Sequence, residues 1–232
     1  MSPTAALVLL AAGSGTRSGL STNKVFAALS GRRVLTWSLD ATRDLPGIDP
    51  VMVVVRPEEA TAAERVLREE SPGREVGVVA GGPTRHASER NALESIRSAV
   101  DSGEVDVVVV HDAARPLAPT AVFADVVTAA REHGGAVPGR LQQALLRRSD
   151  LRPFAGEVLA VQTPQAFGAR LLLDAHDAAA AHGFEGTDTA ACVERFAPWL
   201  RIHALPAPAT NLKITFPEDL ALAERLVARR VR

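Results

Sequence analysis

The sequence predicts an α/β fold: one domain built on a mostly parallel, twisted sheet with helices on both faces. Short apolar runs rich in valine, leucine and alanine occur at 5–11, 51–55, 75–79 and 105–110. Runs of this length suit strands that are covered on both faces. Segments with helical periodicity separate them, and strands alternating with helices at this spacing form right-handed βαβ crossovers. The carboxyl ends of such strands meet at one rim, where α/β proteins bind their ligands.

The composition limits the classes of function. With 232 residues and 47% hydrophobic content, the chain is long enough to bury a core and is not a disordered protein. Its net charge of −1 gives no global field for nucleic acid or for an anionic membrane. The N-terminal residues lack a basic n-region and lead into a glycine-rich loop, so we expect a cytoplasmic protein. Cys192 stands alone, which excludes a disulfide framework and a zinc site built from cysteines.

The remaining elements follow in chain order. Helices are expected at 34–44, 57–70, 85 to about 100, 119–132, 168 to about 182, after the turn at 186–189, and at 217–232. Further strands are expected at 201–205 and 211–215. Residues 136–160 show only a weak pattern, and we interpret them as an excursion from the sheet that serves as a dimerisation arm. No repeat or linker interrupts the chain, so residues 1–232 are expected to form one domain.

The stretch 7–24, with the sequence LVLLAAGSGTRSGLSTNK, carries the first chemical signal. Gly13 and Gly15 let the backbone take turns that a β-carbon would block and let it approach a ligand closely. Successive loop N–H groups can form a concave anion site, and Arg17 and Lys24 add positive charge beside it. The loop therefore predicts a polyphosphate ligand.

Three known phosphate loops can be compared with this stretch. A P-loop ends in Gly-Lys-Ser/Thr, whereas Lys24 here lies between Asn23 and Val25. The dinucleotide fingerprint G-x-G-x-x-G nearly fits, but Ser18 occupies its third glycine position, and no acidic residue ends a second strand. Residues 11–17, with Lys24 downstream, resemble the A-A-G-x-G-x-R loop of nucleotidyltransferases that activate sugar and polyol phosphates.

Two later segments fall at the same predicted rim. Residues 80–85 form a second glycine loop that opens a helix, and Asp112 ends the strand of four valines. A carboxylate at this place can hold Mg²⁺ together with phosphate oxygens, or it can simply cap a helix. Arg115 suits a phosphate or carboxylate. No serine or cysteine lies in a G-x-S-x-G elbow, so a hydrolase triad is not expected.

Six motifs in order make the resemblance specific. The first loop is followed by GG-x-x-R-x-x-S (81–88), HDAARP (111–116), TPQAF (163–167), TD (187–188) and NLKIT-x-PEDL (211–220). Together they resemble the 2-C-methyl-D-erythritol 4-phosphate cytidylyltransferase family over nearly the whole chain, except for about 136–160. The resemblance implies a single Rossmann-like nucleotidyltransferase domain with a protruding arm, a homodimer, and a place in the non-mevalonate isoprenoid pathway.

The resemblance also implies roles for individual positions. The residues expected to read the cytosine and ribose of CTP are Ala11, Ala12, Gly13, Ser14, Gly15, Gly82, Arg85 and Ser88. The expected catalytic cations are Arg17, Lys24 and Lys213, the first two on the triphosphate and the third beside the acceptor. Asp112 is expected to meet Mg²⁺ and the polyol of the acceptor. The residues expected to border the acceptor and its phosphate are Arg115, Thr163 and Thr187.

This chain departs from the family pattern in the arm. The usual P-x-x-D-T-x-K segment is replaced by Pro138-Gly139-Arg140-Leu141-Gln142-Gln143-Ala144, and the D-R or E-R pair before TPQ is missing. The main expectation is CTP-dependent transfer of CMP to 2-C-methyl-D-erythritol 4-phosphate. Alternatives are a related enzyme for another small polyol phosphate or phosphonate, a nucleotide-binding module without activity, and a nicotinamide-dependent dehydrogenase.

Overall fold

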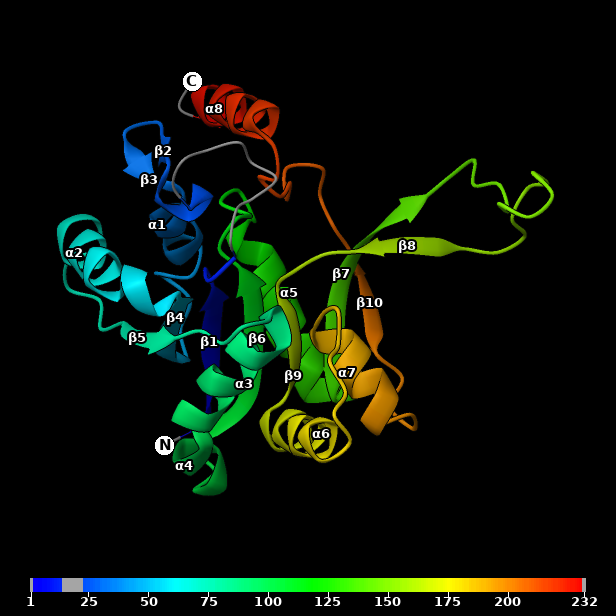
Figure 1. Ribbon diagram of the computed structural model, residues 1–232, viewed down its shortest axis with the longest axis horizontal. Helices are drawn as coiled ribbons and strands as arrows, with labels where there is room; N and C mark the ends of the chain where they lie inside the picture. The colour runs from blue at the N-terminus through cyan, green and yellow to red at the C-terminus, as the bar shows by residue number, and fades with distance from the viewer. Residues whose placement is uncertain (1, 14–22, 231–232) are drawn as a thin grey trace.

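The computed structural model describes residues 2–13 and 23–230 and confirms the predicted α/β fold (Figure 1). Within this part of the chain the main sheet has eight strands. They are β1 (Thr4–Leu10), β4 (Ile48–Val55), β5 (Gly77–Ala80), β6 (Val105–Asp112), β7 (Gly135–Gln142), β8 (Val158–Val161), β9 (Gln165–Gly168) and β10 (His203–Pro206). The four apolar runs in the sequence correspond to β1, β4, β5 and β6, which confirms those predictions.

The sheet is parallel across β6, β1, β4 and β5 and mixed in its other strands. Its order is β10-β7-β9-β6-β1-β4-β5, with β8 paired to β7 outside this path. Strand β1 lies between β4 and β6 and runs parallel to both, and β4 pairs parallel with β5. Strand β9 runs antiparallel between β6 and β7. The carboxyl ends of β1, β4, β5 and β6 therefore lie along one rim.

Helices cover both faces of the sheet, as predicted. They are α1 (Val34–Asp40), α2 (Ala60–Glu70), α3 (Arg85–Ser95), α4 (Arg97–Asp101), α5 (Thr120–His133), α6 (Ala169–Ala181), α7 (Thr189–Phe196) and α8 (Pro217–Arg230), with short 3₁₀ turns η2 (Lys24–Phe26) and η3 (Pro57–Glu59). Alternate residues of β1 belong to two cores: Leu7 and Leu9 pack with α1, α2 and α5, and Ala6 and Val8 pack with α3, α6 and α7. Successive side chains of a strand point to opposite faces of the sheet, so this alternation shows that β1 is buried on both faces.

The arm differs from its prediction in where it begins. The segment with the weak pattern opens with β7, whose residues 135–139 are buried in the sheet and whose residues 140–142 are exposed. From there β7 and β8 leave the body as a two-stranded ribbon that projects well beyond the rest of the molecule (Figure 1). One strand thus crosses from core to solvent, and this change of environment explains why no single periodicity marked it. A small hairpin of β2 (Ala28–Leu29) and β3 (Arg32–Arg33) was also not expected.

Three expectations for individual elements are wrong. Residues 211–215 do not form a strand; the segment is irregular, and its Leu212 and Ile214 side chains pack in a small core with residues of α8. The helix expected from 85 to about 100 divides at Ile96 into α3 and α4. The segment expected to be helical at 34–44 forms helix α1 only as far as Asp40 and continues in turns.

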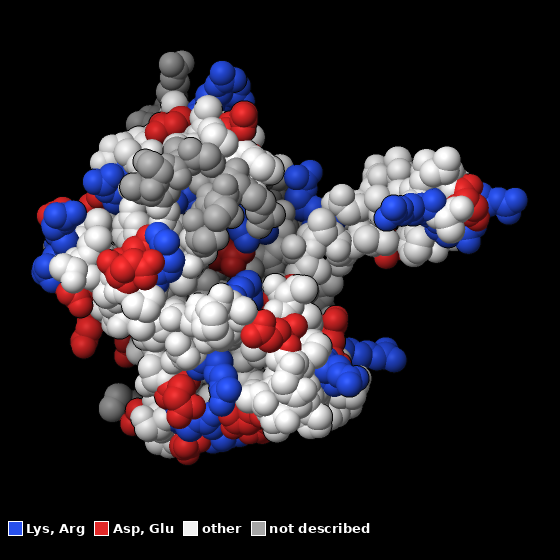
Figure 2. Space-filling view, viewed as in Figure 1, with Lys and Arg blue, Asp and Glu red and all other residues white. Residues whose placement is uncertain are grey.

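No helix in the described part of the chain is both long enough and apolar enough to cross a membrane. On the face seen in Figure 2, acidic and basic side chains are interspersed over the body. This mixture agrees with the small net charge.

Candidate active site

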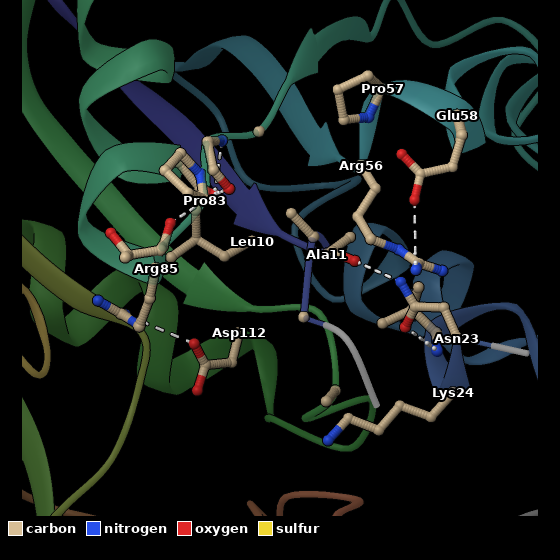
Figure 3. A pocket seen from close by; sticks show the side chains of 18 of the residues that line it. Leu10, Ala11, Asn23, Lys24, Arg56, Pro57, Glu58, Pro83, Arg85 and Asp112 are labelled. Carbon is tan, nitrogen blue, oxygen red and sulfur yellow. Dashed lines mark hydrogen bonds and ion pairs between the residues drawn. The ribbon is translucent and has the colours of Figure 1, made fainter. Parts of the chain in front are cut away.

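A cavity of about 800 Å³ opens at the carboxyl ends of β1, β4, β5 and β6 (Figure 3). Its lining comes from the first loop, the second glycine loop, the end of β6 and the segment before α8. Nine residues predicted for the site line it: Ala11, Ala12, Gly13, Lys24, Gly82, Arg85, Ser88, Asp112 and Lys213. Segments that are far apart in the sequence therefore meet at one rim, as the sheet topology requires. Ser14, Gly15 and Arg17 lie outside the described residues.

Asn23 anchors the far end of the first loop. Its amide donates to the carbonyl oxygen of Ala11 (2.7 Å) and to the carboxylate of Glu59 (3.0 Å). Its side chain also accepts from the Val25 N–H at the start of η2. These bonds tie the residues on either side of the loop together and bring Lys24 to the edge of the cavity (Figure 3). Sequence reasoning missed Asn23, although a buried amide between a glycine loop and a lysine is a signal for such an anchor.

The second glycine loop packs directly against the first. A β-carbon on Gly81 would lie 2.7 Å from the Cβ of Ala12, and one on Gly82 would lie 2.6 Å from the Cβ of Ala87. Both distances are too short for any side chain. Glycine is therefore required at position 81 for the close approach of the two loops, and at position 82 for the packing of the second loop against α3. Ser88 Oγ accepts from the Gly82 N–H (3.1 Å) and donates to the carbonyl of Thr84 (2.9 Å). Ser88 therefore fixes the loop in place.

Asp112 lies at the centre of the charged part of the site. Lys213 Nζ is 2.7 Å from its Oδ2, and a terminal nitrogen of Arg85 is 3.5 Å from its Oδ1. Burial alone would raise the pKa of this carboxyl, but the charges of Lys213 and Arg85 outweigh it and hold the pKa well below the usual range. Asp112 is therefore ionised at any working pH.

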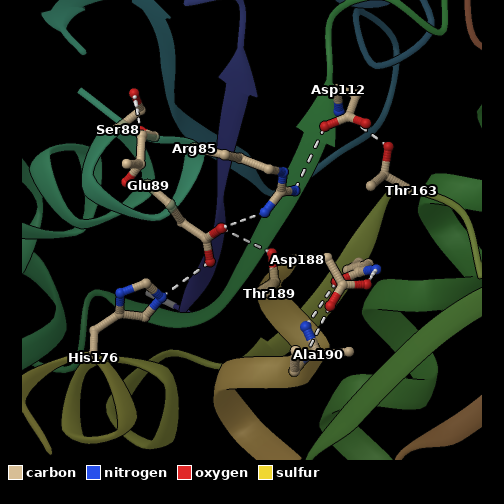
Figure 4. A network of polar contacts seen from close by, with 12 residues as sticks. Arg85, Ser88, Glu89, Asp112, Thr163, His176, Asp188, Thr189 and Ala190 are labelled. Carbon is tan, nitrogen blue, oxygen red and sulfur yellow. Dashed lines mark hydrogen bonds and ion pairs between the residues drawn. The ribbon is translucent and has the colours of Figure 1, made fainter. Parts of the chain in front are cut away.

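Arg85 is held from behind by a second carboxylate (Figure 4). Glu89, one turn along α3 and almost fully buried, accepts from Arg85 at 2.9 Å. The same carboxylate binds the hydroxyl of Thr189 (3.0 Å) and a ring nitrogen of His176 (3.1 Å). Burial would raise the pKa of Glu89, but the hydrogen bond with His176 and the charge of Arg85 lower it. Sequence reasoning missed Glu89 because two of its partners, His176 and Thr189, come from other helices.

Three predicted residues do not line the cavity. Thr163 lies behind Asp112, where its hydroxyl accepts from the Asp112 N–H (3.0 Å). Arg115 donates to the carbonyl of Asn211 (2.8 Å) and so holds the segment that carries Lys213. Thr187 is exposed and precedes Asp188, whose side chain caps α7.

The donor set fits a magnesium ion shared with a ligand. Among the described residues, two carboxylates line the cavity, Asp112 and Glu58. Magnesium usually takes one or two carboxylates and completes its shell with water and substrate phosphates. Asp112 is ionised, and each of its oxygens keeps lone-pair capacity beyond the bond to Lys213 or Arg85. Asp112 would therefore hold such an ion as a single protein ligand.

The arrangement is suited to neutralising an anion. Lys24, Arg85 and Lys213 reach the cavity from three different segments. The one serine hydroxyl described in its lining, that of Ser88, is engaged by backbone groups, so the described lining offers charge and positioning instead of a nucleophile.

Comparisons with known proteins point to one family. The family model for 2-C-methyl-D-erythritol 4-phosphate cytidylyltransferase matches residues 5–229. A protein of that name from Syntrophotalea carbinolica is 36% identical over 226 residues, which cover 94% of each chain. Another from Clostridium perfringens is 30% identical, covering 95% of this chain and 97% of the relative.

Solved structures show the same fold. The crystal structure of 2-C-methyl-D-erythritol 4-phosphate cytidylyltransferase from Thermus thermophilus is 31% identical, with a TM-score of 0.70, and covers 98% of this chain and 100% of the other. The 4-diphosphocytidyl-2C-methyl-D-erythritol synthase from Anaerococcus prevotii has a TM-score of 0.82 at 24% identity, covering 97% and 96% of the two chains.

Proposed function

Because the chain belongs to the 2-C-methyl-D-erythritol 4-phosphate cytidylyltransferase family, we propose that its cavity binds CTP beside 2-C-methyl-D-erythritol 4-phosphate and joins them. The protein is a nucleotidyltransferase of the isoprenoid pathway. The observation that carries this function is the convergence of Lys24, Arg85 and Lys213 with Asp112 on one cavity.

The reaction is an in-line displacement. A phosphate oxygen of the acceptor attacks the α-phosphorus of CTP, a new P–O bond forms, and the bond to pyrophosphate breaks. The acceptor phosphate is largely deprotonated near neutral pH, so the step needs neither a protein nucleophile nor a strong general base. The protein must bring two anions together, and this task falls to positioned cations.

The chain's own groups divide this task. Residues 11–13, Gly82 and Ser88 form the wall where the nucleoside would bind, and Lys24, with Arg17, would hold the triphosphate. Lys213 reaches the cavity beside Asp112 and would meet the acceptor phosphate and the α-phosphate. Arg115 and Thr163 then act as positioning residues, because they hold the Lys213 segment and Asp112 respectively.

Asp112 would hold Mg²⁺ beside the phosphates, where the ion supplies further charge neutralisation. Salt bridges to Lys213 and Arg85 keep Asp112 ionised and oriented toward the cavity before any ligand arrives. The arm is proposed to pair two subunits and to reach the neighbouring acceptor site. The cytoplasmic location expected from the N-terminal residues stays a prediction.

The relatives support methylerythritol phosphate over another small polyol phosphate or phosphonate, because the similarity extends through the arm. The altered arm motif remains a difference from the family pattern. Arg140, at the point where β7 leaves the sheet, is exposed and available to face an acceptor.

The decisive experiment is pyrophosphate release from CTP across a panel of acceptors, with Mg²⁺ and with chelator. We expect the highest kcat/KM with 2-C-methyl-D-erythritol 4-phosphate and no turnover without a divalent cation. A higher kcat/KM with a pentitol phosphate would overturn the acceptor assignment. Binding of CTP with no turnover on any acceptor would favour the module without activity, and binding of NADPH in place of CTP would favour a dehydrogenase.

A further inference from the structure

Three metal-ligating side chains meet in a buried cluster behind the active site. His86 comes from α3, His176 from α6 and Cys192 from α7, and their exposed fractions are 6%, 1% and 0%. One ligand atom from each side chain lies within 4.8 Å of the other two. The two imidazole rings are stacked, with centroids 4.4 Å apart. The cluster does not line the cavity that the proposed reaction uses.

Both imidazoles carry a buried nitrogen that lacks a partner. Among the described side chains, His86 Nδ1 and His176 Nδ1 are buried without a hydrogen bond. The opposite nitrogen of His176, Nε2, lies 3.1 Å from the Glu89 carboxylate. A neutral imidazole carries one proton, and the ionised carboxylate draws it to Nε2. His176 Nδ1 is therefore a bare lone pair inside the protein, an arrangement that costs stability unless something binds it.

We propose that His86, His176 and Cys192 bind a thiophilic divalent metal ion of the zinc class. Zinc takes imidazole nitrogen and thiolate sulfur as ligands, and three protein ligands leave one tetrahedral position for water. Ligand atoms around a tetrahedral zinc lie roughly 3.3–3.8 Å apart given the usual metal–ligand bond lengths, so side-chain adjustments of about 1 Å would close the site. Thiolate and imidazole together select zinc-like ions over magnesium or calcium.

The surroundings of His176 have the form found around metal-bound histidines. Such histidines usually give their second ring nitrogen to a carboxylate, which fixes the ring and raises the basicity of the ligand nitrogen. Glu89 occupies this place, and its other oxygen holds Arg85 (Figure 4). Glu89 would thus connect the ion's ligand His176 to Arg85, the residue that pairs with Asp112.

Two half-buried phenylalanines lie beside the cluster. Phe184 meets the His86 ring edge-on at 6.5 Å and packs against Phe196 at 5.5 Å. The Cys192 thiol donates weakly to the carbonyl of Ala175 (3.6 Å), and burial raises its pKa to about 12. A bound metal deprotonates a coordinating thiol and would cross-link three helices that pack around Glu89.

The test is a titration of the chelator-treated, full-length protein with Co²⁺, followed by competition with Zn²⁺. Cys192 is the only cysteine in the sequence, so a thiolate-to-cobalt charge-transfer band can arise only there. We expect one Co²⁺ per chain, this band together with the visible bands of tetrahedral cobalt, and loss of both on adding Zn²⁺. Failure of wild-type protein to give the thiolate band, with or without other cobalt binding, would overturn the proposal.

Variants separate this site from adventitious binding. Cys192→Ala should abolish the band, and Glu89→Gln should weaken zinc binding by roughly 10- to 100-fold, as loss of an outer-shell carboxylate does. The matched control is His133→Ala/His203→Ala, which removes a second stacked histidine pair with no cysteine beside it and should bind zinc like wild type. Zinc affinity lost in the control but kept in Cys192→Ala would contradict the proposal. The wild-type spectrum decides the question even if a core variant fails to fold.

Discussion

The chemistry of the site depends at the residue scale on how charges are paired before a substrate binds. Asp112 is buried and carries a full negative charge because Lys213 and Arg85 lie beside it. Lys213 is itself 41% exposed in its side chain, so it faces the cavity as well as its partner. A cation placed in this way can exchange a carboxylate contact for a phosphate contact with little rearrangement.

Replacing Lys213 by alanine tests this arrangement. We expect Lys213→Ala to lower kcat by roughly 10²- to 10³-fold, because it removes a preorganised charge that neutralises the developing transition state. The melting temperature should fall, because Asp112 loses one of its two partners, but the fold should persist, since Arg85 still pairs with Asp112. Steady-state pyrophosphate release and thermal unfolding measure the two effects, with Arg225→Ala on exposed α8 as a control. A variant that unfolds yet keeps wild-type kcat in its folded fraction would make Lys213 structural.

His111 makes stability depend on pH. Its ring is fully buried, beside the carbonyl of Arg115 and the hydroxyl of Thr163, and burial lowers its pKa from 6.5 to about 4. Between pH 6.5 and about pH 4, His111 is protonated in the unfolded chain but stays neutral in the folded chain. The free energy of unfolding should therefore fall by about 3 kcal/mol across this window, at about 1.4 kcal/mol per pH unit.

The measurement is urea unfolding between pH 7 and 4, compared with His111→Gln. The variant should show a shallower fall than wild type, whatever its absolute stability, because glutamine does not titrate. Identical slopes for the two proteins would exclude His111 as the origin.

At the scale of elements, the site depends on an irregular segment. The segment 211–216 carries Lys213 to the cavity without joining the sheet. Asn211, fully buried, donates to the Thr163 carbonyl (2.9 Å), and its own carbonyl accepts from Arg115. The Ile214 N–H donates to the carbonyl of Ala114 (2.8 Å), and the Ile214 side chain packs into a small core with α8. These contacts hold the segment in place without strand pairing.

Asn211→Ala should loosen this segment. It leaves the Thr163 carbonyl without its donor, and we expect a loss of about 1–3 kcal/mol in the free energy of unfolding. The kcat of the folded enzyme should also fall, with KM for CTP nearly unchanged, because Lys213 lies two residues away while both nucleotide loops stay in place. Chemical unfolding and steady-state kinetics check both effects. A loss of stability with an unchanged kcat would show that Asn211 does not position Lys213.

The whole molecule is a compact body with one long projection. Apolar side chains are exposed along the ribbon of β7 and β8 and beyond it, at Leu141, Leu145, Leu146, Leu151, Phe154, Leu159 and Val161. Figure 2 shows the arm standing clear of the body, with charged side chains grouped toward its far end. Such an exposed apolar strip is typical of a surface that pairs with another. It is the physical support for the proposed homodimer.

Leu146→Asp/Leu151→Asp should separate the proposed subunits. Both leucines are exposed and belong to the proposed interface. Charges at these positions would make association unfavourable, so sedimentation should change from dimer to monomer, with little change in the body's melting temperature. Leu222→Asp on α8, an exposed leucine of the body, is the matched control and should leave the mass unchanged. A monomeric wild type, or a double variant with the dimer's mass, would contradict the proposed role of the arm.

The sequence by itself determined the parallel half of the sheet and its rim. Runs such as 105–110 admit few structures other than a buried strand, and the order of strands and helices fixes where the strand ends lie. It therefore also indicated Lys24, Gly82, Arg85 and Asp112 as neighbours. Tertiary structure alone decided the contacts of Glu89 with Thr189 and His176, the irregular path of 211–215 and the point where β7 leaves the core. The reason is physical. Local sequence patterns indicate which residues are buried, but they do not indicate which distant residues those side chains contact. The partners of Glu89 and Asp112, for example, include residues about a hundred positions away in the chain.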